Sequence, residues 1–136
     1  NFDMINEKIK KPLDVIFIDS LHEASHVKKV FFNYYKFLKV GGICIVDDIS
    51  WLPYTLNKKK YAPYMAETNI RIFNKILEIY NSNSDNLFLE FFFEGSGIGI
   101  LTKNNNLNLN HDTKIEMHKL TFKNIIKKYF LKKPVR

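Results

Sequence analysis

The sequence of 136 residues lacks the features that mark secreted and membrane proteins. Its single cysteine, Cys44, cannot form a disulfide within the chain. No apolar run approaches the roughly 20 residues that a transmembrane helix needs, and no signal peptide opens the sequence. Cys44 lies inside an apolar run, where burial makes a thiol unreactive, so we expect a core thiol rather than a nucleophile. These absences predict a cytoplasmic protein without a membrane span.

Glycine is scarce as well, with five residues in the chain. No G-x-G-x-x-G motif comes before the first apolar run, and the glycines at 95–99 lie between two expected strands. A phosphate-binding glycine loop requires a strand-to-helix turn. The sequence therefore offers no loop of this kind.

Acidic residues are missing from the C-terminal part of the chain. Of the 21 basic and 14 acidic residues, eight and one, respectively, lie between Lys114 and Arg136. The other thirteen basic and thirteen acidic residues cancel, so this tail carries the whole net charge of +7. We expect a domain over 1–110 and a basic tail or helix over 111–136. Such a tail is typically a solvated helix, and contact with a polyanion is the alternative.

Two apolar runs that end in carboxylates are the most informative feature present. Residues 15–18 are followed by Asp19, and residues 43–46 are followed by Asp47 and Asp48. The segment between the runs predicts an amphipathic helix over 23–38 and a turn at Gly41-Gly42. A strand–helix–strand unit places its strands in parallel, so the three acids should meet at one edge of the sheet. Ligands of open α/β sheets bind at this edge.

The rest of the chain predicts a second helix and a hairpin. Apolar residues at helical spacing indicate a helix over 67–81 with Ile70 and Ile76 on its inward face. Residues 87–94 and 98–103 should form an antiparallel hairpin around Gly95-Ser96-Gly97. The fold class expected is α/β, with a βαβ unit, a helix and a closing hairpin. This is half of a doubly wound sheet.

Several kinds of site compete for these residues. Three acids at one sheet edge can hold a hard cation or orient a polar substrate, whereas strand-end acids also cap turns and helices. His22-Glu23-Ala24-Ser25-His26 matches the H-E-x-x-H zinc motif. However, His22 would fall at or before the first helical turn, so the two imidazoles need not share a helix face. A zinc hydrolase is thus a lesser alternative, and the acidic pocket of response regulators fits less well still.

Two segments carry a family resemblance. Residues 13–22 (LDVIFIDSLH) and 35–49 (YKFLKVGGICIVDDI) resemble the fourth strand, its following helix and the fifth strand of class I S-adenosylmethionine-dependent methyltransferases. Residues 94–101 (EGSGIGIL) resemble the entry into the last strand of that family. The likeness covers roughly residues 3–103 and is strongest to the branch of small-molecule and sugar O-methyltransferases. It implies a Rossmann-like fold whose N-terminal, cofactor-binding half is absent from the chain.

The resemblance also implies roles for individual residues. Metal-dependent members place acids at these strand ends, so Asp19, Asp47 and Asp48 would hold Mg²⁺, and Asp19 would contribute to the cofactor site. His22 would be the catalytic base for a substrate hydroxyl. The aromatic residues Trp51 and Tyr54 follow the acids and would wall the substrate pocket, with core packing as the alternative for Trp51.

We therefore expect methyl transfer from S-adenosylmethionine to a hydroxyl of a small molecule, such as a sugar, with Mg²⁺ as a further cofactor. The chain alone should be inactive, because its partner, the missing N-terminal half of the domain, supplies most cofactor contacts. The alternative of another class is a non-catalytic α/β binding fragment whose basic tail docks on a polyanion.

Overall fold

The computed structural model describes residue 5, residues 7–56 and residues 62–112. The expected basic tail falls almost entirely outside these residues, so its helix and its polyanion contact stay predictions, as does the division of the chain at residue 110. Within the described part, no helix combines the length and the apolar character that crossing a membrane requires.

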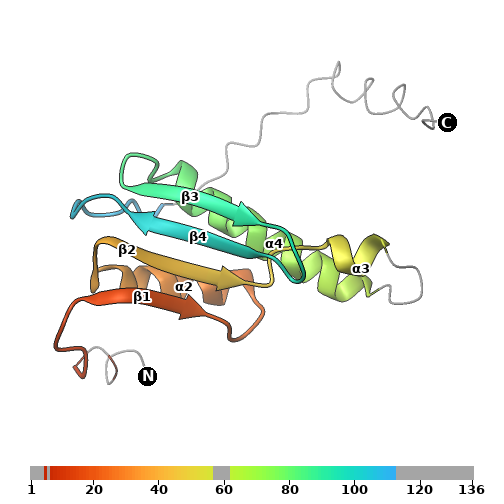
Figure 1. Ribbon diagram of the computed structural model, residues 1–136, viewed down its shortest axis with the longest axis horizontal. Coiled ribbons are helices and arrows are strands. Elements are labelled where there is room, and N and C mark those ends of the chain that lie inside the picture. The colour runs from red at the N-terminus through yellow and green to blue at the C-terminus, as the bar shows by residue number, and fades with distance from the viewer. Residues whose placement is uncertain (1–4, 6, 57–61, 113–136) are drawn as a thin grey trace, which may run out of the picture.

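The described residues form one four-stranded sheet, in the order β1-β2-β4-β3 (Figure 1). The strands are β1 (Leu13–Ile18), β2 (Leu38–Asp47), β3 (Leu87–Phe92) and β4 (Ile98–Lys103). β1 and β2 are parallel, whereas β4 is antiparallel to both β2 and β3. The predicted fold class, a βαβ unit closed by an antiparallel hairpin, is confirmed.

Two helices cover the same face of this sheet (Figure 1). α2 (Ala24–Tyr35) connects β1 to β2, and α4 (Pro63–Asn81) precedes the hairpin. The strands alternate, so every second side chain points toward these helices. The buried cluster between the layers joins strand and helix side chains: Ile16, Ile18, Cys44, Val46, Leu101, Val27, Phe31, Ile72, Ile76 and Ile79. Complete burial raises the pKa of the Cys44 thiol to about 12, so this cysteine is the expected inert core thiol.

The opposite face of the sheet is apolar and uncovered by the described residues. Val15 and Phe17 of β1 are 50% and 59% exposed, and Phe88 and Phe92 of β3 are 52% and 50% exposed. Ile43, Ile45 and Ile100 occupy the corresponding rows of the central strands. A doubly wound sheet buries both of its faces, so in such a fold further elements would cover this one.

Three expectations about the elements need correction. The helix predicted over 23–38 ends at Tyr35, and β2 begins at Leu38, before the expected glycine turn. Gly41 lies inside β2 with a φ of 78°, where the pairing of Leu13 with Leu38 shifts to that of Val15 with Ile43. The glycines therefore permit an irregular strand instead of ending a helix.

The second helix is longer than predicted and is rotated. It begins at Pro63, and its buried stripe runs through Ile72, Ile76 and Ile79, whereas Ile70 is 36% exposed. A short helix, α3 (Leu52–Leu56), lies between β2 and α4.

Candidate functional site

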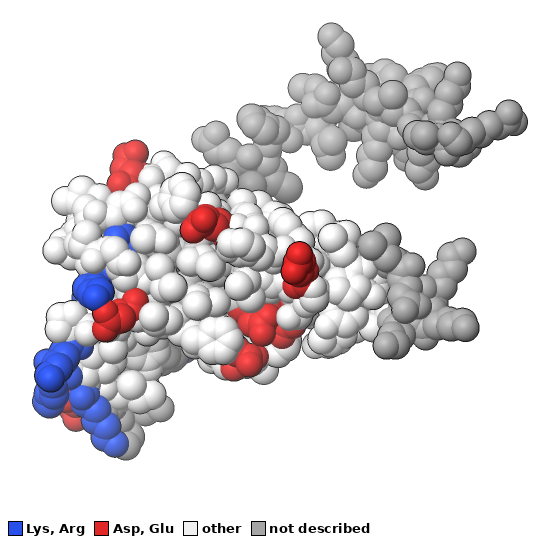
Figure 2. Space-filling view, in the orientation of Figure 1, with Lys and Arg blue, Asp and Glu red and all other residues white. Residues whose placement is uncertain are grey.

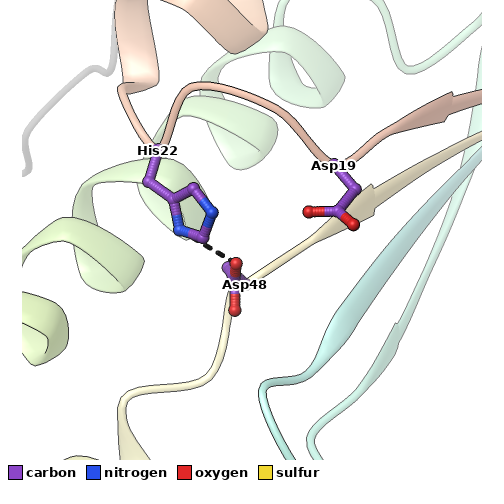
Figure 3. Close-up of side chains that lie close together, drawn as sticks. All are labelled: Asp19, His22 and Asp48. Carbon is purple, nitrogen blue, oxygen red and sulfur yellow. Dashed lines mark ion pairs between the residues drawn. The ribbon is translucent and has the colours of Figure 1, made fainter.

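The carboxyl ends of β1 and β2 bring three polar side chains together (Figure 3). Asp19 follows β1 directly, His22 lies in the loop before α2, and Asp48 follows β2. One ligand atom from each residue can be chosen so that the three atoms lie within 4.8 Å of one another. The closest contact is an ion pair in which His22 Nδ1 lies 2.9 Å from Asp48 Oδ2. The geometry thus assembles two carboxylates and one imidazole from two strands, as the parallel pairing predicts.

Asp48 owes its position to an unusual backbone conformation. It is the single non-glycine residue with a positive φ, 60°, in the described part of the chain. Asp and Asn adopt this left-handed region more readily than other residues with a side chain. The preceding residue stabilises the turn, because Asp47 Oδ1 accepts a hydrogen bond of 2.7 Å from the Asp48 N–H.

The β3–β4 hairpin supports this turn from the side. Ser96 Oγ donates a hydrogen bond of 2.9 Å to Asp47 Oδ1, and the Ser96 carbonyl accepts one of 2.6 Å from Ser50 N–H. At Gly97 the two chains approach so closely that a Cβ atom would lie 2.6 Å from Ser50 Cβ. Gly97 also has a φ of 75°. The hairpin therefore holds the segment that carries the acids through contacts that need glycine at this position.

Helix α4 secures the other side of the same segment. Asn69 Nδ2 donates a hydrogen bond of 2.8 Å to the Ser50 carbonyl, and both residues are fully buried. The bond is therefore sheltered from competing water. Asp47, Asp48 and Ser50 are thus fixed by a strand, a hairpin and a helix at once.

The surroundings of Asp48 disfavour the charged form of its carboxyl group. Burial raises the pKa of the Asp48 carboxyl above its ordinary value, the neighbouring carboxylates of Asp47 and Asp19 raise it further, and His22 opposes these effects. The side chain of Asp48 is 15% exposed, whereas that of His22 is 41% exposed. A cation bound among the carboxylates would relieve the repulsion between them.

The free space among these residues is small. The hollow lined by Asp19, His22, Asp47 and Asp48 has a volume of about 10 Å³. That volume suits one small ion or one water molecule and is too small for a substrate. Asp47 lines the same hollow as the three residues of the cluster. Its Oδ1 atom already accepts two hydrogen bonds.

The remaining candidate residues lie apart from the carboxylates. Trp51 contacts Phe73 and Phe93 edge-on, with ring centroids 5.4 Å and 6.0 Å apart, so its observed role is packing between α4 and the end of β3. Tyr54 lies on α3 and is partly buried. The role of these two aromatic residues as pocket walls stays a prediction.

The two histidines of the H-E-x-x-H motif face different partners. His22 precedes α2 and pairs with Asp48, whereas His26, inside α2, lies 3.0 Å from Ser20 Oγ through Nε2. A zinc hydrolase requires both imidazoles on one face of a helix. The observed placement does not favour that alternative.

Two positioning residues were not anticipated from the sequence. The sequence analysis predicted Ser96 only as part of the hairpin turn. A serine between two glycines in a hairpin nevertheless indicates a close approach of the backbone. Asn69 carried a weaker signal, namely an amide within the apolar stripe of a helix, where a buried polar group needs a partner.

Comparison with known proteins finds a family model that resembles the first part of the chain. Residues 1–49, which include the whole carboxylate cluster, match the family model described as a methyltransferase domain. No curated protein matches the chain. The fold has close counterparts among solved structures, each under 20% identical in sequence.

A Staphylococcus aureus protein assigned as a caffeoyl-CoA O-methyltransferase has a TM-score of 0.53 and 19% identity over 76% of this chain. The S-adenosylhomocysteine-bound methyltransferase PaMTH1 of Podospora anserina has a TM-score of 0.54 and 14% identity over 77% of the chain. The mycinamycin-pathway methyltransferase MycE, solved with Mg and S-adenosylhomocysteine, has a TM-score of 0.50 and 12% identity over 98% of the chain. The chain spans 48%, 47% and 36% of these proteins, respectively. The resemblance to half of a class I methyltransferase domain is confirmed.

Proposed function

Because residues 1–49 match a methyltransferase domain and the described residues have the fold of solved O-methyltransferases, we propose a catalytic role for the carboxylate cluster. The chain contributes the acceptor side of an enzyme that moves a methyl group from S-adenosylmethionine to a hydroxyl of a small molecule. The observation that carries this proposal is the pairing of His22 with Asp48 beside Asp19 at the carboxyl edge of the sheet.

His22 is the general base in this proposal. A carboxylate 2.9 Å from Nδ1 keeps the imidazole proton on that nitrogen, so Nε2 presents its lone pair. A substrate hydroxyl at Nε2 would transfer its proton there while its oxygen attacks the methyl carbon of S-adenosylmethionine, whose sulfur–methyl bond breaks so that S-adenosylhomocysteine leaves. Asp48 then stabilises the imidazolium that forms. The 41% exposure of the His22 side chain leaves the ring accessible to a substrate.

Asp19 and Asp48, with Asp47 beside them, fit a divalent cation. Carboxylate oxygens are the ligands that Mg²⁺ prefers. Burial is the main cause of the raised pKa of Asp48, and a cation would offset the smaller contribution of its repulsion from Asp47 and Asp19. The MycE structure contains Mg, which supports the same choice of metal here. When bound, Mg²⁺ orients a substrate hydroxyl and makes it more acidic. Asp19 would in addition contribute to the cofactor site, as the family resemblance implies.

The cofactor itself requires a partner segment. The glycine-rich loop that supports S-adenosylmethionine is absent from this sequence, and the uncovered face beside β1 leaves room for further elements. We infer that an N-terminal half of the same domain covers the face formed by Val15, Phe17, Phe88 and Phe92. The whole enzyme, with both halves, is then the unit that binds the cofactor. A sugar is the acceptor that the family branch suggests.

The test is methyl transfer by the complete protein, measured as S-adenosylhomocysteine formed from S-adenosylmethionine in the presence of mixed glycosides and catechols. His22→Gln should reduce the rate by about 10²- to 10⁴-fold, as expected for loss of a general base, while cofactor affinity is unchanged. His26→Gln is the matched control, because His26 contacts Ser20 and not the acids. Equal rates for both variants, or undiminished turnover in excess chelator, would contradict the roles of His22 or of the metal, respectively.

A further inference from the structure

A second polar region lies at the opposite edge of the sheet, where β1 and β2 begin. Two cavities of about 520 Å³ and 660 Å³ meet there and share Lys36, Lys103 and Asn106 in their walls. The first cavity is lined by five lysines: Lys10, Lys11, Lys36, Lys39 and Lys103. Figure 2 shows basic side chains gathered at this end of the molecule. Because β4 runs antiparallel to β2, its last residue, Lys103, reaches this edge and not the carboxylate edge.

Lys103 is unusual because its ammonium group is inside the protein. The residue is 4% exposed, and its Nζ donates a hydrogen bond of 2.6 Å to the Leu38 carbonyl and lies 4.7 Å from the centre of the Tyr35 ring. No carboxylate in the part of the chain that the structure describes pairs with it. Burial lowers the pKa of Lys103, which shows that its charge is poorly solvated. An ammonium has three N–H donors, so Lys103 retains capacity for an anionic acceptor.

Tyr35 packs beside Lys103. It lines the larger cavity and is 6% exposed, and its hydroxyl has no hydrogen-bond partner among the described residues. Burial raises the pKa of Tyr35 to about 12, so the hydroxyl keeps its proton. Because less than 1 Å² of its oxygen is exposed, this hydroxyl does not face the cavity, and Tyr35 contributes to the site through its ring, over which the Lys103 ammonium lies.

The charge around the first cavity is also unbalanced. Among the described residues, Lys39 pairs with Asp14, while no acidic partner accompanies Lys10, Lys11, Lys36 or Lys103. Lys36 instead lies over the ring of Phe37, 4.9 Å from its centre. Bringing like charges together at one hollow is unfavourable unless an anion compensates them. Phosphate groups are the anions that lysines commonly bind in proteins.

We propose that these joined cavities bind a small molecule that carries a diphosphate or triphosphate group. The volumes lie within the range of about 300 to 1,000 Å³ typical of small-ligand sites. The lysines gather around these two adjoining hollows, which favours a compact polyanion as the ligand. S-Adenosylmethionine carries no phosphate, so this site is separate from that of the methyl donor. Lys36 and Lys103 hold the anion, and the ring of Tyr35 keeps the Lys103 ammonium in the wall of the larger cavity.

Calorimetric titration of the complete protein with inorganic triphosphate tests the proposal, without S-adenosylmethionine or acceptor. We expect saturable binding that Lys36→Met weakens about tenfold, because it loses one charge-assisted hydrogen bond. Lys36 is exposed, so this variant should fold normally. Arg71→Met is the control, since this substitution also removes one positive charge, but from α4, where the Arg71 side chain is 70% exposed.

A second pair of variants addresses the buried residues. Lys103→Arg should retain more triphosphate affinity than Lys103→Met, whereas Tyr35→Phe keeps the ring beside Lys103 and should bind triphosphate like the parent. The proposal is overturned if triphosphate does not bind, if Arg71→Met weakens binding as much as Lys36→Met, or if only a DNA or RNA oligonucleotide binds. Because each readout is binding of an anion, failure here leaves the methyl-transfer proposal unaffected, and the reverse also holds.

Discussion

The imidazole of His22 and the carboxylate of Asp48 meet at a distance of 2.9 Å, although the two residues follow different strands of the sheet. Their contact depends on the parallel pairing of β1 and β2, which places both strand ends at one edge. It also depends on the backbone turn at Asp48, which the hairpin and α4 hold in place. The pair is therefore a property of the whole fold, and changes distant from it in sequence should affect it.

Asp48→Asn should lower the activity of the enzyme and raise its stability at neutral pH. The folded-state pKa of Asp48 is raised, so the folded protein binds its proton more tightly than the unfolded chain does, and ionisation costs stability as pH rises through the folded-state pKa. The variant should thus gain stability relative to the parent at pH 7 and lose that advantage at pH 3, where both states are protonated. Urea unfolding at the two pH values measures the difference. The same relative stability at both would contradict the raised pKa described for Asp48.

Ser96→Ala should weaken Mg²⁺ binding, although Ser96 is not itself a proposed metal ligand. Ser96 Oγ donates to Asp47, and loss of such an outer hydrogen bond typically costs about 10- to 100-fold in metal affinity. Titration of the complete protein with Mg²⁺ measures the effect. Ser25→Ala, at an exposed serine of α2, is the control and should leave the affinity unchanged. Equal affinities for the two variants would remove Ser96 from the support of the site.

Gly97→Ala and Gly95→Ala should separate a steric clash from backbone strain. Both glycines have a positive φ, but a Cβ at Gly97 meets Ser50 at 2.6 Å, whereas one at Gly95 meets nothing within 4 Å. Both variants should lose about 1–2 kcal/mol for the left-handed backbone. Gly97→Ala should lose about 1–3 kcal/mol more from overpacking, and its activity should fall with the displaced acids. Thermal unfolding of both variants checks this, and equal losses would argue against the close approach.

Phe17→Ala should reveal whether a second half covers the sheet. In the complete protein a buried Phe17 would make the substitution cost about 3–5 kcal/mol. If the face stays open, as in the described residues, where Phe17 is 59% exposed, the cost should be within about 0.5 kcal/mol. Tyr64→Ala, at a 76% exposed position of α4, provides the comparison for an aromatic residue in solvent. Matching small effects for the two variants would contradict the proposed N-terminal half.

The βαβ unit could be predicted from the sequence because its strands are short apolar runs with carboxylates behind them. Parallel pairing then follows from the crossover connection, and Asp19 and Asp48 must meet. The irregular start of β2 could not be foreseen. Gly41-Gly42 looks like a turn, and only the pairing of Leu38 with Leu13 shows that the strand begins before it.

The burial of α4 was harder to predict for a different reason. Its large apolar residues divide between two surfaces, since Phe73 and Ile76 pack toward the sheet whereas Ile70 is 36% exposed. The helical spacing of apolar residues predicts a single apolar stripe and does not distinguish the two surfaces. The support of the acids by Ser96 and Asn69 depends on tertiary contacts between residues far apart in the chain, and no local pattern contains that information.

The left-handed backbone at Asp48 limits how this position can change over evolution or in a selection experiment. In a library with every amino acid at position 48, the conformational cost of the left-handed backbone would decide which variants fold. The chemistry of the side chain would then decide which folded variants are active. Glycine, asparagine and aspartate adopt this backbone most easily. Of these three, aspartate alone adds a negative charge beside His22. Glutamate, the usual conservative replacement, should therefore be rarer among functional clones than its charge would suggest, and asparagine should persist among folded but slow ones.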